Sequence, residues 1–338
     1  MNGPANGYRD AMPARPRSPA SWRALAAAVG RPSRRMTRGV LIANVVAQVA
    51  IVVTGGAVRL TGSGLGCSTW PQCEPGRFTP VRHEAASWHP IIEFGNRTLT
   101  GALLIVAVAT AWVVLRQVGR SHSVRALALV PIIGVLVQAV LGGLTVLVQL
   151  HPAVVGSHFL LSMVLIAAST QLLLREAQPD APARWDTTPA IRSLSLLLVP
   201  LAAVMLVLGS VTTGTGPHSG DDSAPYRFAF DPLVVTRAHS SSVWLYLAVL
   251  GALVVLVHRA TAGGSHARQQ IWVLVAVTLL QGLVGYVQYF TGLPGGLVAL
   301  HMLGASLLVV AQTRQLGGLR PRGTTPTPTG PAATLIAV

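Results

Sequence analysis

The sequence predicts an all-α membrane protein with eight transmembrane helices, arranged as two tandem four-helix bundles with both termini in the cytoplasm. Three observations predict this fold class: the composition, the number of long apolar segments and an internal repeat. The chain is 51% hydrophobic and only 10% charged, whereas a soluble domain has about 25% charged residues. So few charged residues cannot cover the surface of a folded protein in water. Most of this surface must therefore face lipid. We therefore expect a multi-pass protein of the cell (inner or plasma) membrane.

The apolar segments define the predicted helices. Crossing a hydrocarbon core of about 30 Å takes about 20 helical residues. In lipid each such segment must be a helix, because every backbone donor and acceptor needs a partner within the segment. Eight segments qualify, at residues 38–57, 92–115, 125–148, 154–174, 192–212, 235–257, 270–290 and 295–314.

The arginines predict the orientation. All 25 basic residues are Arg, and most lie before the first span, after every second span and after the last. Because positively charged loops stay in the cytoplasm, both termini are predicted to be cytoplasmic. The net charge of +15 is therefore interpreted as a topology signal, and no nucleic-acid partner is expected.

An internal repeat relates the two halves of the chain. Residues 138–170 align with residues 281–313 at a constant offset of 143, and the same offset places Asn96 over His239. Each half therefore has a polar residue on its second helix, Asn96 or His239, and a histidine on its fourth, His158 or His301. The predicted organisation is a disordered cytoplasmic segment 1–37, a first half 38–175, a cytoplasmic linker 176–191, a second half 192–316 and a disordered tail 317–338.

Three histidines lie about four to seven residues inside helices entered from the outer face: His158, His239 and His301. An ionisable group at that depth is rare unless it faces the bundle interior and has a partner. For any one of them the alternative is an interhelical hydrogen bond. In the second half, His239 and His301 lie at matching depth, which favours joint ligation. Two imidazoles do not make a four-ligand zinc site, whereas haem supplies four nitrogens of its own, so the pair predicts a haem with two axial histidines.

The first half differs, because Asn96 occupies the place of His239. Asn is not a usual axial ligand of haem iron, so a tight bis-histidine haem is not expected there. Glu93, one helical turn before Asn96, is a candidate functional carboxylate. The alternative is an ion pair with Arg97. This pattern predicts an electron-handling haem in the second half beside an open substrate-haem site in the first.

The two cysteines, Cys67 and Cys73, both fall in the first outer loop. In an oxidising outer compartment such a pair is most simply a disulfide. A structural crosslink and a redox-active pair are both open interpretations. Trp70, Trp88 and Trp244, near the outer helix ends, are predicted to be interfacial anchors.

These residues carry a family resemblance. The run Gly55–Cys67 (GGAVRLTGSGLGC), followed by Thr69–Cys73 (TWPQC), closely resembles the first outer loop of haem A synthases. With the Glu93–Arg97 motif and the three histidines, the likeness covers residues 38–315. Members of that family are duplicated eight-helix bundles that oxidise the C8 methyl group of haem O to the formyl group of haem A, with oxygen from water, for terminal oxidases.

The resemblance also implies roles for individual residues. Many family members have a histidine where Asn96 stands, which leaves His158 as the sole obvious protein ligand for the haem O substrate. The second half would hold a haem b cofactor. The implied metal ligands are His239 and His301 for haem b and His158 for the substrate, the implied substrate contacts are Asn96 and Arg97, and the implied catalytic proton acceptor is Glu93.

The candidate partners are membrane lipid, the haem O synthase (protohaem farnesyltransferase), oxidase assembly factors and a second copy of the chain. Two other function classes were weighed. A b-type cytochrome that only carries electrons through two haems needs four axial histidines, and Asn96 removes one. A transporter with inverted repeats conflicts with the even number of spans per half, which gives parallel repeats.

Overall fold

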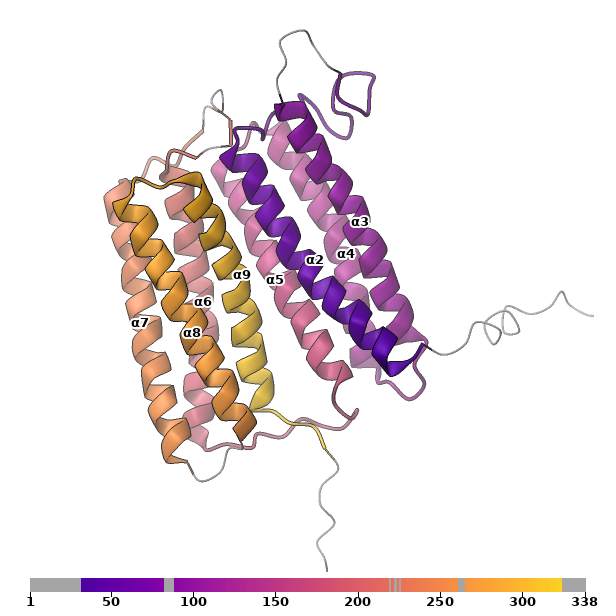
Figure 1. Ribbon diagram of the computed structural model, residues 1–338, viewed down its shortest axis with the longest axis vertical. Coiled ribbons are helices and arrows are strands. Elements are labelled where there is room, and N and C mark those ends of the chain that lie inside the picture. The colour runs from indigo at the N-terminus through magenta and orange to yellow at the C-terminus, as the bar shows by residue number, and fades with distance from the viewer. Residues whose placement is uncertain are drawn as a thin grey trace, which may run out of the picture.

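The computed structural model describes residues 32–81, 88–218, 220–221, 224, 226–260 and 265–323. This part of the chain contains eight α-helices, each long and apolar enough to span a membrane, and no β-strand (Figure 1). The predicted class, an all-α membrane protein with eight spans, is confirmed. The helices are α2 (Arg34–Leu60), α3 (His89–Leu115), α4 (His122–Leu147), α5 (Pro152–Glu176), α6 (Pro189–Thr215), α7 (Pro232–Arg259), α8 (Ser265–Phe290) and α9 (Gly295–Gly318).

The observed helices contain the predicted spans, apart from residue 148, and most extend beyond them by about one turn. Polar residues begin several of these extra turns. The side chains of Ser33, Thr188 and Asp231 each accept a hydrogen bond from a backbone N–H of the first turn, which satisfies donors that have no partner inside the helix. Residues 34–37, expected in the segment before the first span, are therefore helical.

The helices form two groups (Figure 1). In the first bundle, α2 packs against α3 and α5, and α4 packs against the same two helices. In the second bundle, α6 packs closely against α7 and α8 against α9, while these two pairs contact each other more sparsely. The bundles meet where α9 lies against α2 and α5, and where α5 lies against α6.

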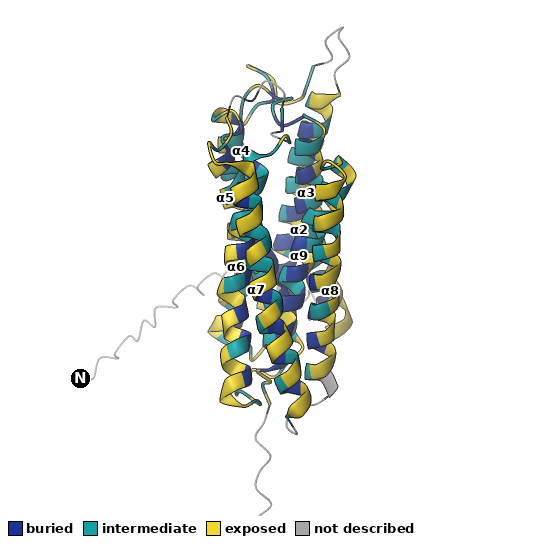
Figure 2. Ribbon diagram, turned by 90° about the vertical axis from the view of Figure 1, so that its left-hand side faces the viewer, coloured by how far each residue is buried: buried dark blue, intermediate teal, exposed yellow. Residues whose placement is uncertain are grey.

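The cores of the bundles lie toward the end where α2 begins and α9 ends, here called the termini end. The first core includes Leu41, Val114 and Leu172, and the second includes Leu253 and Leu274, all nearly inaccessible to solvent. Figure 2 shows the buried residues on the inward faces and exposed residues outside. Because lipid covers the outer faces, exposed apolar side chains there are expected. The opposite end, here called the loop end, holds the segments after α2, α4, α6 and α8.

At the termini end, the linker before α6 is joined to the segment after α9. The backbone N–H of Arg184 donates to the carbonyl of Pro321 over 3.2 Å. The guanidinium groups of Arg192 and Arg320 lie 5.1 and 5.0 Å from the ring centre of Trp185, a favourable cation–π geometry. Residues 317–323, expected to be disordered, are thus partly helical and partly fixed against the linker; residues 324–338 and 1–31 lie outside the described residues.

Candidate functional site

His239 on α7 and His301 on α9 face each other across the second bundle. Their ring centroids are 6.5 Å apart and their planes are inclined by 78°. Both residues are half-buried. They lie seven and six residues after the first residues of their helices, near the loop end. The structure therefore brings together the two histidines that the sequence pairs.

A glycine on a neighbouring helix makes room for each imidazole. A Cβ atom at Gly209 on α6 would lie 3.0 Å from Cε1 of His239, and one at Gly285 on α8 would lie 3.1 Å from Cε1 of His301. Both distances are shorter than an ordinary van der Waals contact, so a larger residue would displace the ring. The glycines thus fix how far each imidazole lies from the bundle centre.

A hydrogen bond orients the ring of His239, and another holds the backbone of His301. Nδ1 of His239 lies 3.0 Å from the carbonyl oxygen of Met205. Because a carbonyl only accepts, Nδ1 carries the proton and Nε2 keeps a lone pair for a metal. The side chain of Gln281 donates to the carbonyl of His301 over 2.8 Å, which fixes the backbone of α9 at that residue. Nδ1 of His301 is buried with no partner among the described residues.

The spacing of these rings fits one metal ion between them. Two metal–nitrogen bonds of about 2.0 Å, each extended by the roughly 1.1 Å from a ring nitrogen to its ring centre, place the centroids roughly 6 Å apart, close to the observed 6.5 Å. Within the described residues, no group of three or more His, Cys, Asp or Glu side chains is placed to hold a metal ion. A bare ion would therefore lack ligands, whereas haem brings four of its own. The donor set of the second bundle, two imidazoles at this spacing, suits a haem.

The first bundle repeats this arrangement with one imidazole. His158 on α5 faces Gly142 on α4, where a Cβ atom would lie 3.3 Å from Cε1 of the ring. Asn96 on α3 faces Gly55 on α2, where a Cβ atom would lie 3.9 Å from Nδ2 of the amide. Gln138 donates to the carbonyl of His158 over 3.0 Å, as Gln281 does to that of His301. A haem with two protein imidazoles does not fit here, since among the described residues only His158 brings an imidazole to this place.

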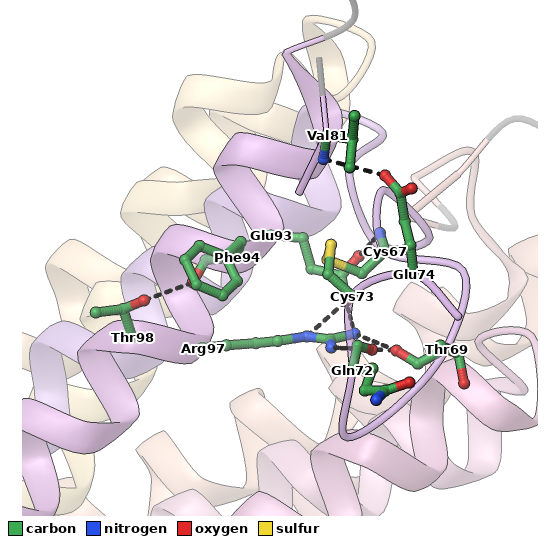
Figure 3. The surroundings of a disulfide bond; sticks show 10 residues. All are labelled: Cys67, Thr69, Gln72, Cys73, Glu74, Val81, Glu93, Phe94, Arg97 and Thr98. Carbon is green, nitrogen blue, oxygen red and sulfur yellow. Dashed lines mark hydrogen bonds and ion pairs between the residues drawn. A yellow bond between two sulfur atoms is a disulfide. The ribbon is translucent and has the colours of Figure 1, made fainter. Parts of the chain in front are cut away.

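Glu93 on α3 forms an ion pair with Arg97, the alternative that the sequence left open (Figure 3). Oε1 of Glu93 accepts from Nη2 and Nε of Arg97 over 2.5 and 3.1 Å. Oε2 accepts from the backbone N–H of Cys67 over 2.6 Å. Glu93 is 5% exposed, so these partners replace the solvation that a buried carboxylate loses.

Arg97 extends this contact to the loop between the cysteines. Its guanidinium donates to the carbonyl of Thr69 over 3.1 Å and to that of Gln72 over 3.2 Å (Figure 3). The planar fork of donors suits such a multiple contact. Glu93 and Arg97 together therefore fasten the loop to α3.

The disulfide between Cys67 and Cys73 is present, as predicted, and both cysteines are fully buried. Trp70 lies within the closed loop, and its ring packs against Gly143 on α4, where a Cβ atom would lie 2.3 Å from Cδ2 of the indole. Trp70 is half-buried against the bundle, and its role as an interfacial anchor stays a prediction. Trp88, by contrast, is 68% exposed.

Contacts at the loop end join the two bundles. Arg59, at the end of α2, donates to the carbonyls of His218 and Thr213 over 2.5 and 3.1 Å. Gly64 donates to the carbonyl of Gly220 over 2.7 Å. Sequence reasoning did not find these contacts or the glycines that face the histidines. For the glycines a signal existed, because Gly142 and Gly285 occupy matching places in the repeat.

Fold and site together define a class: a multi-pass helical membrane protein made of two four-helix bundles. Each bundle carries a histidine on its fourth helix, and its second helix carries Asn96 in the first bundle and His239 in the second. The model of the family COX15-CtaA, described as cytochrome oxidase assembly protein, matches residues 38–313. The chain belongs to this family, and it is a multi-pass protein of the cell membrane.

Curated relatives carry the name "Heme A synthase". The chain is 39% identical to that of Bacillus pumilus over 129 residues, which are 37% of this chain and 40% of the relative. It is 25% identical to that of Bacillus licheniformis over 151 residues, 44% of this chain and 48% of the relative. These two matches span less than half of each relative. A match to the Lysinibacillus sphaericus protein, at 24% identity over 286 residues, covers 79% of this chain and 90% of the relative.

Proposed function

We propose that the chain is a haem A synthase, an oxidoreductase that converts the C8 methyl group of haem O to the formyl group of haem A. The observation that carries the proposal is the facing pair His239 and His301, with centroids 6.5 Å apart, beside a bundle that repeats the arrangement with a single imidazole. The family and the names of the relatives support this reading. A carrier with two bis-histidine haems is not favoured, because Asn96 supplies no imidazole.

In the second bundle, His239 and His301 would hold a haem b. When bound, this group would supply a one-electron redox centre. The protein's part is to keep the imidazoles in place. The carbonyl of Met205 sets which nitrogen of His239 is free for iron, and Gly209 and Gly285 set the position of the rings.

In the first bundle, His158 would hold the substrate haem O. Oxidising a methyl group to a formyl group with oxygen from water releases four protons and four electrons. The electrons would leave one at a time through the haem of the second bundle to an external electron acceptor, and the protons need an acceptor within the site. We assign this role to Glu93, which lies one helical turn from Asn96 on α3. Arg97 balances its charge and holds the loop above it.

The surroundings of the enzyme are part of the proposal. The haem O synthase would supply the substrate, and oxidase assembly factors would receive the product. Membrane lipid surrounds the exposed apolar faces, and a second copy of the chain is a candidate partner. From the distribution of arginines we infer that both termini are cytoplasmic, which would put the loop end and the disulfide on the outer side.

The test is co-expression with a haem O synthase in a host that makes no haem A, followed by haem extraction and chromatography. We expect haem A to appear with the wild-type chain. The His301→Ala variant, expressed at the same level, should accumulate haem O. Membranes in which the chain binds haem in its second bundle but leaves haem O unchanged would contradict the enzyme and favour a b-type electron carrier.

A further inference from the structure

Asn96 occupies the structural place of an axial ligand. It lies on the second helix of its bundle, opposite a glycine of the first helix, as His239 does opposite Gly209. Its counterpart across the bundle, His158, has the same glycine contact and the same glutamine-to-carbonyl hydrogen bond as His301. By the arrangement that brings His239 and His301 together, the repeat places an imidazole on one side of the first bundle and a carboxamide on the other.

The carboxamide of Asn96 has an unused acceptor. Its Oδ1 is buried and makes no hydrogen bond with the described residues. A buried polar atom without a partner is costly, so such an atom in a native structure calls for an explanation. A carboxamide is not among the usual axial ligands of haem iron, but it both accepts and donates hydrogen bonds. The carboxamide is thus suited to form a hydrogen bond with a small molecule that is itself bound to the iron.

We propose that the first bundle holds the iron of its tetrapyrrole through His158 alone, and that the opposite side is an exchangeable site for a small iron ligand, with Asn96 as its hydrogen-bond partner. The inference rests on the proposed function only in that the first bundle binds a tetrapyrrole. The ligands of the site are small molecules with a lone pair for iron and an N–H or O–H for Oδ1, such as water or imidazole. A substrate held by one protein ligand also dissociates more readily than one held by two.

Imidazole is the most direct probe, because it resembles the side chain present at His239. Bound to iron through one nitrogen, it directs its N–H toward an acceptor beside it. 1-Methylimidazole binds iron in the same way but has no N–H to donate. The two probes therefore differ in the hydrogen bond that Asn96 is proposed to accept.

The experiment uses the purified full-length chain loaded with haemin to occupy both bundles, and follows the optical and electron paramagnetic resonance spectra. We expect a low-spin haem from the second bundle that no probe alters, and a high-spin haem from the first that imidazole converts to low spin. Imidazole should bind about tenfold more tightly than 1-methylimidazole, the worth of one hydrogen bond. In Asn96→Ala the two probes should bind about equally.

Asn96→His is the complementary variant. It should supply the second imidazole, make the first-bundle haem low-spin without any probe and block imidazole binding. An unchanged high-spin signal in this variant would show that residue 96 does not face the iron and would overturn the proposal.

Other outcomes also overturn it. One is a wild-type first-bundle haem that is already low-spin without any probe. Uptake of haemin by the second bundle alone is another. Failure of the proposed function is a separate result: the first bundle would bind imidazole as described while haem O stays unconverted in the co-expression assay.

Discussion

At the scale of single residues, the first bundle depends on the charges of Glu93 and Arg97. Both oxygens of the Glu93 carboxylate accept hydrogen bonds, one set from Arg97 and one from the backbone of Cys67. The ion pair therefore holds the loop against α3 whether or not Glu93 also accepts a proton in the reaction. Separating these roles requires variants that break the ion pair from each side.

Glu93→Gln keeps the size of the side chain and an acceptor for Cys67 but cannot take up a proton as a carboxylate does. If Glu93 is the proton acceptor, haem A formed per unit of protein should fall by at least about 100-fold. Arg97→Gln breaks the same ion pair and leaves the carboxylate, so its loss should be much smaller. Equal losses in the two variants would leave Glu93 only as an anchor of the loop.

Asp180, in the linker after α5, gives a pH-dependent contribution to stability. It accepts hydrogen bonds from the backbone N–H and the hydroxyl of Ser121 and pairs with Arg175 over 3.0 Å. These contacts hold the pKa of Asp180 below its ordinary value. The hydrogen bond from the backbone N–H of Ser121 has the largest effect, and the Ser121 hydroxyl and Arg175 add to it. Since folding favours the charged form, the contribution is complete above the unfolded pKa of about 3.9 and is lost as the pH falls through the folded value.

We therefore expect Asp180→Asn to lower the melting temperature in detergent near neutral pH. The difference from the wild-type chain should shrink as the pH is lowered below about 4, because the wild-type carboxylate is then protonated as well. Thermal melts over a series of pH values measure this. A difference that stays constant down to the acid limit would show that the charge of Asp180 is not involved.

At the scale of elements, the loop after α2 is the part that distinguishes the first bundle. The disulfide closes it, α3 fastens it through Glu93 and Arg97, and Trp70 packs on Gly143 of α4. Gly143 directly follows Gly142, which faces His158. The loop thus rests on the bundle next to the proposed substrate site, which favours a structural role for the disulfide.

The contact between Trp70 and Gly143 can be tested by a double-mutant cycle. Gly143→Ala places a methyl group where the indole lies and should destabilise the chain by about 1–3 kcal/mol. In a Trp70→Ala background the same change should cost little. Gly101→Ala on α3 is the control, because its Cβ atom meets nothing within 4 Å; it should be neutral or slightly stabilising. Additive melting-temperature changes would mean that the two residues do not interact.

The sequence predicted the membrane spans well, but it did not predict the capped first turns or the contacts between distant residues. Hydropathy located every span because lipid demands an apolar helix of fixed length, but it missed first turns such as 34–37, which are polar and capped. The matching depth of His239 and His301 in their helices paired these two residues correctly. The sequence did not reveal the contact of Trp70 with Gly143 or that of Met205 with His239, because residues far apart in the chain make them and neither has a local pattern.

At the scale of the whole molecule, the bundles are coupled through α2 and α9. A Cβ atom at Gly56 on α2 would lie 2.6 Å from Sδ of Met302 on α9. Met302 directly follows His301. A larger residue at position 56 would therefore have to displace the end of the Met302 side chain, beside a proposed ligand of the second bundle.

This coupling predicts an effect across the interface. Gly56→Val displaces the thioether of Met302 beside His301, so we expect it to lower the haem content of the second bundle, measured as the amount of low-spin haem per chain. Gly39→Val on the same helix is the matched control, since a Cβ atom there meets nothing within 4 Å. Full haem content in Gly56→Val would show that α9 tolerates the larger residue and that the bundles are less tightly coupled.

His158 and His301 each lie six residues after the first residue of their helices, at the same end of the molecule. An electron passing between groups held at these two positions would travel parallel to the membrane plane. Moving a charge across the full membrane costs or yields about 2.3 kcal/mol per 100 mV, but lateral movement crosses almost none of that field. Under the proposed function, transfer between the two haems would therefore run at the same rate in energised and de-energised cells.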